Sequence, residues 1–288
     1  MDALKIAGIS YLILCLVLWR YQTQLIFFPD PILRNTPDNL GLTYEEVFLP
    51  VEDGQVHGWW MPTAQKPAAQ KPTAENTSSQ IAPTVLYLHG NGSNVGDLVY
   101  RASQLHQWGC NVLLIDYRGY GLSSGPFPNE KRVYADSEAA WQYLIQQRQI
   151  SAESIVIYGH SLGGAIALNL ATQHPNVAGT ITESTFASMT AMVKYQYPLL
   201  VVVPTRWLLQ NKFDSLKKVP SLQTPLLLIH GKRDRIVPAP MSQQLYEATP
   251  ASTPKTLLWI EEGDHNNLPT VGAERYSAAI QTFIEKHT

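Results

Sequence analysis

The sequence has only two cysteines in 288 residues, Cys15 inside an apolar N-terminal run and Cys110 just before a second apolar run. A bridge between them would tie a membrane-like segment to the protein core, so we expect no disulfide framework. Cysteine and histidine do not cluster at the spacing of a zinc site either. We therefore expect neither a metal nor another cofactor.

Charge is also scarce. Charged residues make up 15% of the chain, the formal net charge is −2, and no basic stripe is present. A nucleic-acid partner is therefore not expected, because such partners require clustered positive charge. With 45% hydrophobic residues the chain is globular, and its length allows one large α/β domain or two small ones.

The longest uncharged run covers residues 6–19, between Lys5 and Arg20. Its 14 residues are fewer than the roughly 20 of a typical membrane span, but the run lengthens if Arg20 reaches toward a headgroup layer. We expect residues 1–28 to form an uncleaved membrane anchor. A secretory signal and a buried core helix are the alternatives, and no small-x-small cleavage site follows the run. Basic residues flank both ends, so the orientation stays open.

Two segments precede the main part of the chain. Residues 43–49 and 56–61 are strand-like and flank Asp53-Gly54, which predicts a β-hairpin. Residues 63–82 are rich in Pro, Ala, Gln and Ser and contain Ala-Gln-Lys-Pro twice. They lack apolar side chains to bury, so we expect a flexible surface loop.

From residue 84 onward, strand-like and helical segments alternate. Several of the strands are apolar on both faces, as strands covered by helices on both sides must be. The pattern predicts an α/β domain over residues 29–288 with a mostly parallel sheet, whose functional side chains follow the carboxyl ends of strands. The predicted strands cover 84–88, 111–115, 154–158, 178–182, 225–229 and 256–260, and the predicted helices 97–108, 129–148, 162–172, 241–248 and 271–286.

A Gly-x-Ser-x-Gly motif at residues 159–163 lies between a predicted strand and a helix that is apolar nearly all round. Such a sharp turn lifts Ser161 above the sheet and places the helix N-terminus beneath its hydroxyl. We expect Ser161 to be a nucleophile. The alternative is a serine that only caps the helix.

The loop after the strand at 84–88 reads His89-Gly90-Asn91-Gly92. A helix follows, so this is a strand-end loop, not a hairpin. We expect the backbone N–H groups of Asn91 and Leu162 to point at a substrate oxyanion. His89 is expected to brace the loop.

Two later strand ends carry the remaining candidates. Asp234 follows the strand at 225–229, where a carboxylate could orient a histidine, and His265 follows the strand at 256–260, where a general base could reach Ser161. The alternatives are a loop aspartate paired with Arg233 or Arg235, and a surface histidine.

Taken together, the motifs resemble the alpha/beta-hydrolase superfamily over residues 40–288. They are LHGNG at 88–92, DYRGYG at 116–121, GHSLGG at 159–164, HGKRDRIVP at 230–238 and GDHNN at 263–267. The apolar N-terminus resembles a membrane-anchored branch near serine-aminopeptidase-like and protein-depalmitoylase-like hydrolases. The resemblance implies an eight-stranded sheet, a triad of Ser161, Asp234 and His265, oxyanion donors at Asn91 and Leu162, and a structural turn at 116–119.

Residues 184–224 have no place in the predicted sheet, and this fold usually inserts a cap there. The segment is rich in aromatic and aliphatic residues, which either bind an acyl substrate or pack the cap onto the core. We predict hydrolysis of an ester or thioester. An aminopeptidase, with Glu183 binding the substrate amine, and a non-catalytic membrane-bound binding protein are the alternatives.

Overall fold

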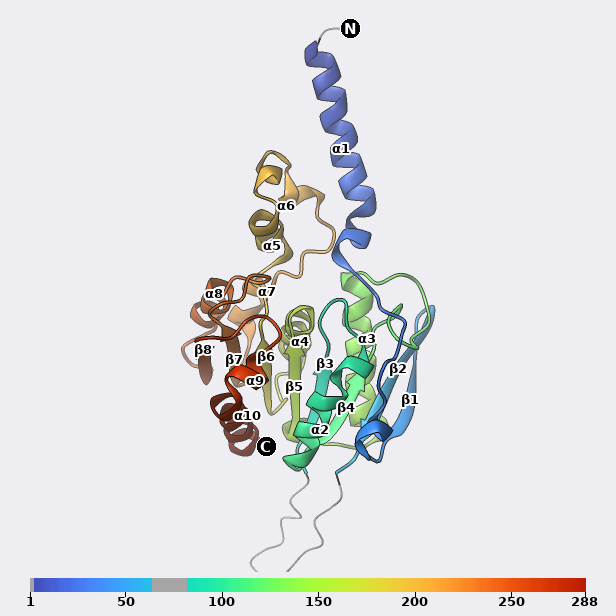
Figure 1. The fold of residues 1–288 in the computed structure, drawn as a ribbon, viewed down its shortest axis with the longest axis vertical. Coiled ribbons are helices and arrows are strands. Elements are labelled where there is room, and N and C mark those ends of the chain that lie inside the picture. Colours follow the sequence, from blue (N-terminus) through green and yellow to red (C-terminus); the bar gives the residue numbers. More distant parts are fainter. Residues whose placement is uncertain (1–2, 64–81) are drawn as a thin grey trace, which may run out of the picture.

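The computed structural model describes residues 3–63 and 82–288 (Figure 1). Its centre is an eight-stranded sheet of order β1-β2-β4-β3-β5-β6-β7-β8, in which β2 runs antiparallel to both neighbours and all other pairs are parallel. The predicted alpha/beta-hydrolase fold with a mostly parallel sheet is confirmed. The strands are β1 (Glu45–Val51), β2 (Gly54–Met61), β3 (Thr84–Leu88), β4 (Asn111–Ile115), β5 (Ile155–His160), β6 (Gly179–Glu183), β7 (Leu226–Gly231) and β8 (Lys255–Ile260).

Sequence-based strand boundaries agree with these to within two residues. The agreement follows from composition at strands such as β3 and β4, whose apolar runs are buried along nearly their whole length. The loop predicted at 63–82 falls almost entirely on residues 64–81, which lie outside the described residues. That loop remains a prediction.

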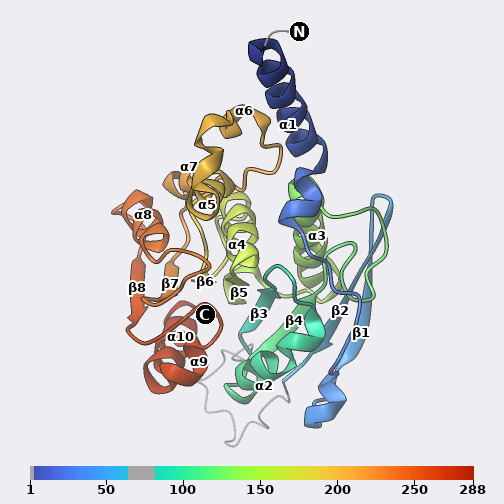
Figure 2. The same ribbon diagram turned by 45° about the horizontal axis from the view of Figure 1, so that its top comes forward.

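Helices cover both faces of the sheet (Figure 2). On one face, α4 is buried from Leu162 to Ala171, as its all-round apolar pattern predicts. That face carries α3 (Glu130–Gln142), α4 (Leu162–Gln173) and α8 (Pro240–Ala248), and the other carries α2 (Val99–Gln107), α9 (Leu268–Val271) and α10 (Ala273–His287).

The predicted helical stretch over residues 129–148 is confirmed, but its last turn is π-helical. The α-helix ends at Gln142, and Tyr143–Gln147 forms a π-helical turn closed by the Arg148 N–H on the Tyr143 carbonyl. The wider turn places the Arg148 guanidinium over the Tyr143 and Trp60 rings. Because Trp60 belongs to β2, far away in the chain, no local sequence pattern could have indicated this contact.

One helix stands apart from this body. α1 (Ala3–Ile26) is long and apolar enough to cross a membrane, and none of its most apolar window is buried in the protein. The alternative of a buried core helix is therefore wrong.

Beside α1 stands the segment of residues 184–224, which we call the cap segment (Figure 1). Its short helices are α5 (Met189–Gln196), η5 (Pro198–Val202), α6 (Thr205–Leu208), α7 (Ser215–Lys218) and η6 (Val219–Ser221).

The turn at residues 116–121 is held by a buried ion pair. The Arg118 backbone N–H and Nε donate to the Asp136 carboxylate at 2.9 and 2.7 Å, and both side chains are buried. The turn presents Tyr120, whose hydroxyl donates to the Asn91 side chain at 2.8 Å. The predicted structural turn thus supports the loop that follows β3.

Replacing Asp136 by Ala should destabilise the protein by about 3–5 kcal/mol, because it leaves the Arg118 guanidinium buried without its counter-charge. Denaturant unfolding of the full chain in mild detergent measures the effect. The exposed Lys217–Asp214 pair provides the control, since Lys217→Ala should cost less than about 1 kcal/mol. Equal losses in the two variants would contradict the assignment.

Candidate active site

Ser161 lies at the turn from β5 into α4 with a φ of 54°, a left-handed conformation that non-glycine residues rarely adopt. The turn is tight because the backbones touch. A Cβ added at Gly159 would lie 2.1 Å from the Gly163 carbonyl oxygen, and one at Gly163 would lie 2.0 Å from the Leu88 carbonyl oxygen. Only glycine fits at these two positions, which explains the motif.

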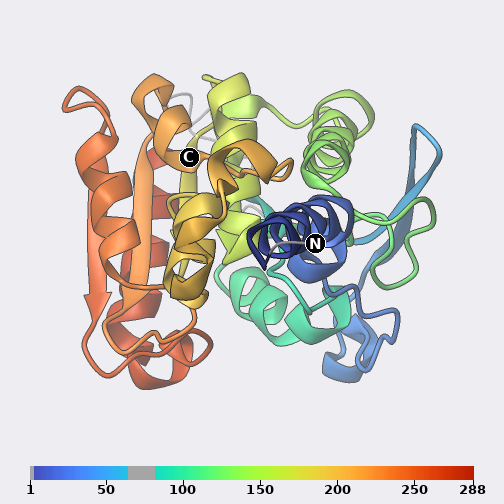
Figure 3. The ribbon, with the colours of Figure 1, turned by 90° about the horizontal axis from the view of Figure 1, so that it is seen from above.

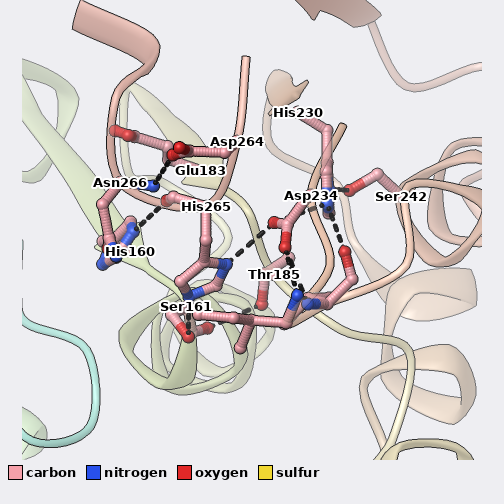
Figure 4. Close-up of polar contacts among 12 residues, drawn as sticks. His160, Ser161, Glu183, Thr185, His230, Asp234, Ser242, Asp264, His265 and Asn266 are labelled. Atoms are coloured by element: carbon pink, nitrogen blue, oxygen red, sulfur yellow. Dashed lines mark hydrogen bonds and ion pairs between the residues drawn. The ribbon is translucent and has the colours of Figure 1, made fainter. Parts of the chain in front are cut away.

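The structure brings the three predicted side chains together (Figure 4). The Nε2 atom of His265 lies 3.0 Å from the Ser161 Oγ, and its Nδ1 atom lies 2.8 Å from the Asp234 Oδ2. The residues come from the ends of β5, β7 and β8, which share one edge of the sheet. The arrangement can carry a proton from the serine to the histidine while the carboxylate orients the ring.

Asp234 is fixed from several sides. Its Oδ1 accepts the backbone N–H groups of Ile236 and Val237, each at 2.8 Å, and His230 Nε2 lies 3.2 Å from Oδ2. Burial alone would raise the pKa of Asp234, but the hydrogen bonds from His230 and His265, the charge of His265 and the Val237 N–H together lower that pKa well below its usual range. The carboxylate therefore stays ionised at neutral pH.

His160, next to the serine, supports the loop that carries His265. Its Nε2 lies 3.1 Å from the His265 carbonyl oxygen, to which it can donate. Burial is the main cause that lowers the pKa of His160 to about 4. The ring is neutral at pH 7, and its position suits a structural role.

The two predicted oxyanion donors lie at the same edge. Leu162 is the first residue of α4, and neither its backbone N–H nor that of Asn91 has a hydrogen-bond acceptor among the described residues. His89 is fully buried, and its Nδ1 donates to the Gly90 carbonyl at 2.7 Å, in agreement with the predicted bracing role. The backbone N–H groups of Asn91 and Leu162 are therefore free to bind an incoming anion.

The Asn91 side chain makes contacts that the sequence did not suggest. Its Nδ2 donates to the Ile26 carbonyl at 2.5 Å, and its Oδ1 accepts the Phe28 N–H at 2.9 Å. The end of α1 is thereby attached directly to the loop after β3. These residues are more than 60 positions apart in the chain, so no local motif could have indicated the contact.

Glu183, the predicted amine-binding residue, is fully buried with its carboxylate already occupied. It forms two contacts with Arg101 at 2.9 and 3.0 Å and accepts the hydroxyls of Tyr158 and Tyr276 at 2.7 and 2.8 Å. Burial raises its pKa, but the charges of Arg101 and His160 and the hydrogen bonds outweigh burial and lower the pKa to about 2. Glu183 supports the edge of the sheet and does not line the cavity.

A cavity of about 690 Å³ opens above Ser161 and His265. This volume is typical of small-molecule sites. Within residues 3–63 and 82–288, no group of three or more His, Cys, Asp or Glu side chains could hold a metal ion. The loops around the triad, including residues 90–93, form its floor. Much of the remaining wall comes from α1 and the cap segment, namely Leu18, Gln22, Leu25 and Ile26 of α1 and Phe186, Met189, Met192, Leu200, Val203 and Leu208 of the cap segment.

The model of the family described as "Serine aminopeptidase, S33" matches residues 79–217 and 208–269. The chain belongs to this family of alpha/beta hydrolases.

Similar proteins extend over nearly the whole chain. An uncharacterised protein of Mycobacterium tuberculosis is 32% identical over 268 residues, covering 93% of this chain and 88% of the relative. A protein of Saccharomyces cerevisiae, named an uncharacterised membrane protein, is 32% identical over 284 residues and covers 93% and 90%. An esterase from Pyrococcus furiosus has a TM-score of 0.71 at 21% identity, covering 91% of this chain and 97% of the esterase, which shows a shared fold.

Replacing Glu183 by Gln should lower the free energy of unfolding at pH 7 by about 3 kcal/mol, because Arg101 loses its buried counter-charge. A carboxyl whose pKa is lowered on folding stabilises the protein above its unfolded pKa of about 4.3, and this contribution disappears as pH falls through the folded value. The difference between wild type and variant should therefore shrink between about pH 4 and pH 2. Denaturant unfolding across this range tests the expectation, with the exposed Glu247→Gln as control. A pH-independent difference would argue against it.

Proposed function

We propose that this protein is a serine hydrolase that cleaves an ester or thioester bond through an acyl-enzyme. One observation carries the proposal, namely the continuous hydrogen-bonded chain from the Ser161 hydroxyl through His265 to the Asp234 carboxylate. A non-catalytic binding protein would have no need for this chain, nor for a strained backbone at Ser161.

In the proposed mechanism, His265 Nε2 takes the hydroxyl proton as Ser161 Oγ attacks the acyl carbon. The backbone N–H groups of Asn91 and Leu162, with the N-terminus of α4, stabilise the negative oxygen of the tetrahedral intermediate. The protonated His265 then gives its proton to the leaving alcohol or thiol. Water, activated by the same histidine, releases the acid and restores Ser161.

Support for an acyl substrate over a peptide comes from the cavity and its surroundings. The cavity walls from α1 and the cap segment are mainly aliphatic, and the carboxylate of Glu183 is occupied by Arg101, Tyr158 and Tyr276. The family description favours an aminopeptidase as the second candidate. In that case Asp97, which lines the cavity, would have to bind the amine, although it already accepts the Asn94 N–H at 3.2 Å.

We also propose that α1 is retained and holds the domain to a membrane. The relative from Saccharomyces cerevisiae is named a membrane protein. In addition, the Gln22 side chain donates to the Leu208 carbonyl at 3.1 Å and accepts the Gln210 N–H at 2.7 Å. Cleavage of α1 as a signal peptide would remove the Gln22 contacts and the part of the cavity wall that α1 forms.

Replacing Ser161 by Ala should abolish labelling by a fluorophosphonate probe, and Asp234→Asn should lower kcat for a p-nitrophenyl ester by about 10³–10⁴-fold. Gel fluorescence and a spectrophotometric assay measure the two effects. The exposed Ser221→Ala serves as control and should label normally. Aminoacyl-nitroanilides tested in parallel should be cleaved more slowly than the esters. Absence of labelling in folded wild-type protein would favour the binding protein instead.

Replacing Asn91 by Ala keeps its backbone N–H but removes the hydrogen bonds of its side chain with Ile26, Phe28 and Tyr120. We expect kcat to fall about tenfold with KM changed less than twofold, because oxyanion donors act in the transition state. Steady-state kinetics separate the two constants. Asn91→Asp, which retains an acceptor for the Phe28 N–H, should recover part of the loss. A rise in KM alone would show that the side chain does not position the donor.

A further inference from the structure

The outer end of the cap segment exposes large apolar side chains that do not pack on the core, and all of them except Tyr197 lie outside the lining of the cavity. Leu199 is 89% exposed and Trp207 is 85% exposed. Several large apolar side chains this exposed on one short segment are characteristic of surfaces that meet a partner or a membrane. We call the five exposed residues of this patch the cap tip; they are Tyr195, Tyr197, Leu199, Val202 and Trp207.

The cap tip is attached to α1 well up the helix. The Tyr11 hydroxyl donates to the Val202 carbonyl at 2.8 Å, while Gln22, lower on the helix, is bonded to Leu208 and Gln210. In Figures 1 and 2, α1 and the cap helices stand side by side on the same side of the domain, and Figure 3 shows them together from above. The cap tip therefore lies at the same level along the axis of α1 as the middle of that helix.

That level is informative because Tyr11 lies within the apolar run at residues 6–19. The run is about 21 Å long as a helix, compared with a hydrocarbon core of about 30 Å. If α1 is held in a bilayer, the backbone of Val202, hydrogen-bonded to Tyr11, lies at the level of that run. Water cannot cover the cap tip in this position, but lipid can.

Charge favours the same partner. Residues 184–213 contain Lys194, Arg206 and Lys212 and no acidic residue, in a chain whose net charge is −2. Residues 3–29 likewise contain Lys5 and Arg20 without an acid. Aliphatic and aromatic side chains next to basic ones are typical of surfaces that enter the interface of an anionic bilayer.

We propose that the cap tip inserts into the same anionic lipid layer as α1, and that the substrate's acyl chain enters the cavity laterally from that layer. The seam between the two inserted segments is also the wall of the cavity, where Leu18 and Leu25 of α1 face Met192 and Leu200 of the cap segment. The substrate class is a membrane-resident acyl ester or thioester. This inference rests on the proposed hydrolase function and adds the source of the substrate.

Depth labelling tests the insertion independently of activity. Cys15→Ser leaves only the buried Cys110, so one cysteine can be introduced and coupled to an environment-sensitive fluorophore. The full chain is reconstituted in phosphatidylcholine–phosphatidylserine vesicles that carry quenchers on their acyl chains. A label at Trp207→Cys should be quenched within about twofold of a label at Leu12→Cys on α1. A label at the exposed Glu285→Cys on α10 should not be quenched. A quenched label at 12 with an unquenched label at 207 would overturn the proposal.

Kinetics test the entry of substrate. Leu199→Glu and Trp207→Glu should leave hydrolysis of a soluble short-chain p-nitrophenyl ester unchanged, which also reports folding. Hydrolysis of a long-chain ester embedded in the vesicles should fall at least tenfold. Tyr100→Glu on α2, an exposed aromatic outside the cap tip, is the matched control and should affect neither activity. Unchanged vesicle activity in the two cap variants would refute lateral entry. If the wild type does not hydrolyse the short-chain ester, the proposed function is refuted. The depth-labelling result on membrane insertion would still hold.

Discussion

The parallel pairing of β3, β5, β6, β7 and β8 is the constraint on which everything else in this molecule depends. Parallel strands end at one edge, so the residues that follow β3, β5, β7 and β8 meet although they are as far as 174 positions apart, from Asn91 to His265. The pairing requires strands that are apolar on both faces, because helices cover both sides. The same apolar runs that make the sheet recognisable in the sequence therefore also determine where polar chemistry can occur.

Much of the fold and the positions of the three central side chains could be predicted for this reason. A Gly-x-Ser-x-Gly between an apolar strand and an apolar helix has few structural solutions, and Asp234 and His265 each lie in the loop that follows a strand. The order of elements along the chain was sufficient to place them at a common edge. No knowledge of which residues contact one another across the fold was needed.

What could not be predicted depends on contacts between distant segments. The attachment of Asn91 to Ile26, of Gln22 to Leu208 and of Tyr11 to Val202 joins the N-terminal helix to the rest of the protein, and none has a local signal. Glu183 was the candidate for binding a substrate amine under the alternative aminopeptidase hypothesis. Its side chain instead pairs with Arg101 of α2, and no local pattern indicates where α2 places that arginine. The π-turn after α3 is likewise accompanied by a distant contact, that of Arg148 with Trp60.

The absence of any spacer after α1 has a consequence for how the protein can operate. Phe27, one residue beyond the helix, is buried in the core, with its ring 6.0 Å from that of Phe213. A domain joined to its anchor by a flexible tether could sample bonds over a wide range of heights above a lipid surface. Here the helix and the domain form one continuous body, so Ser161 would be held at a single height. Substrates would then be sorted by how far their scissile bond stands from the surface, whatever the identity of the group that carries it.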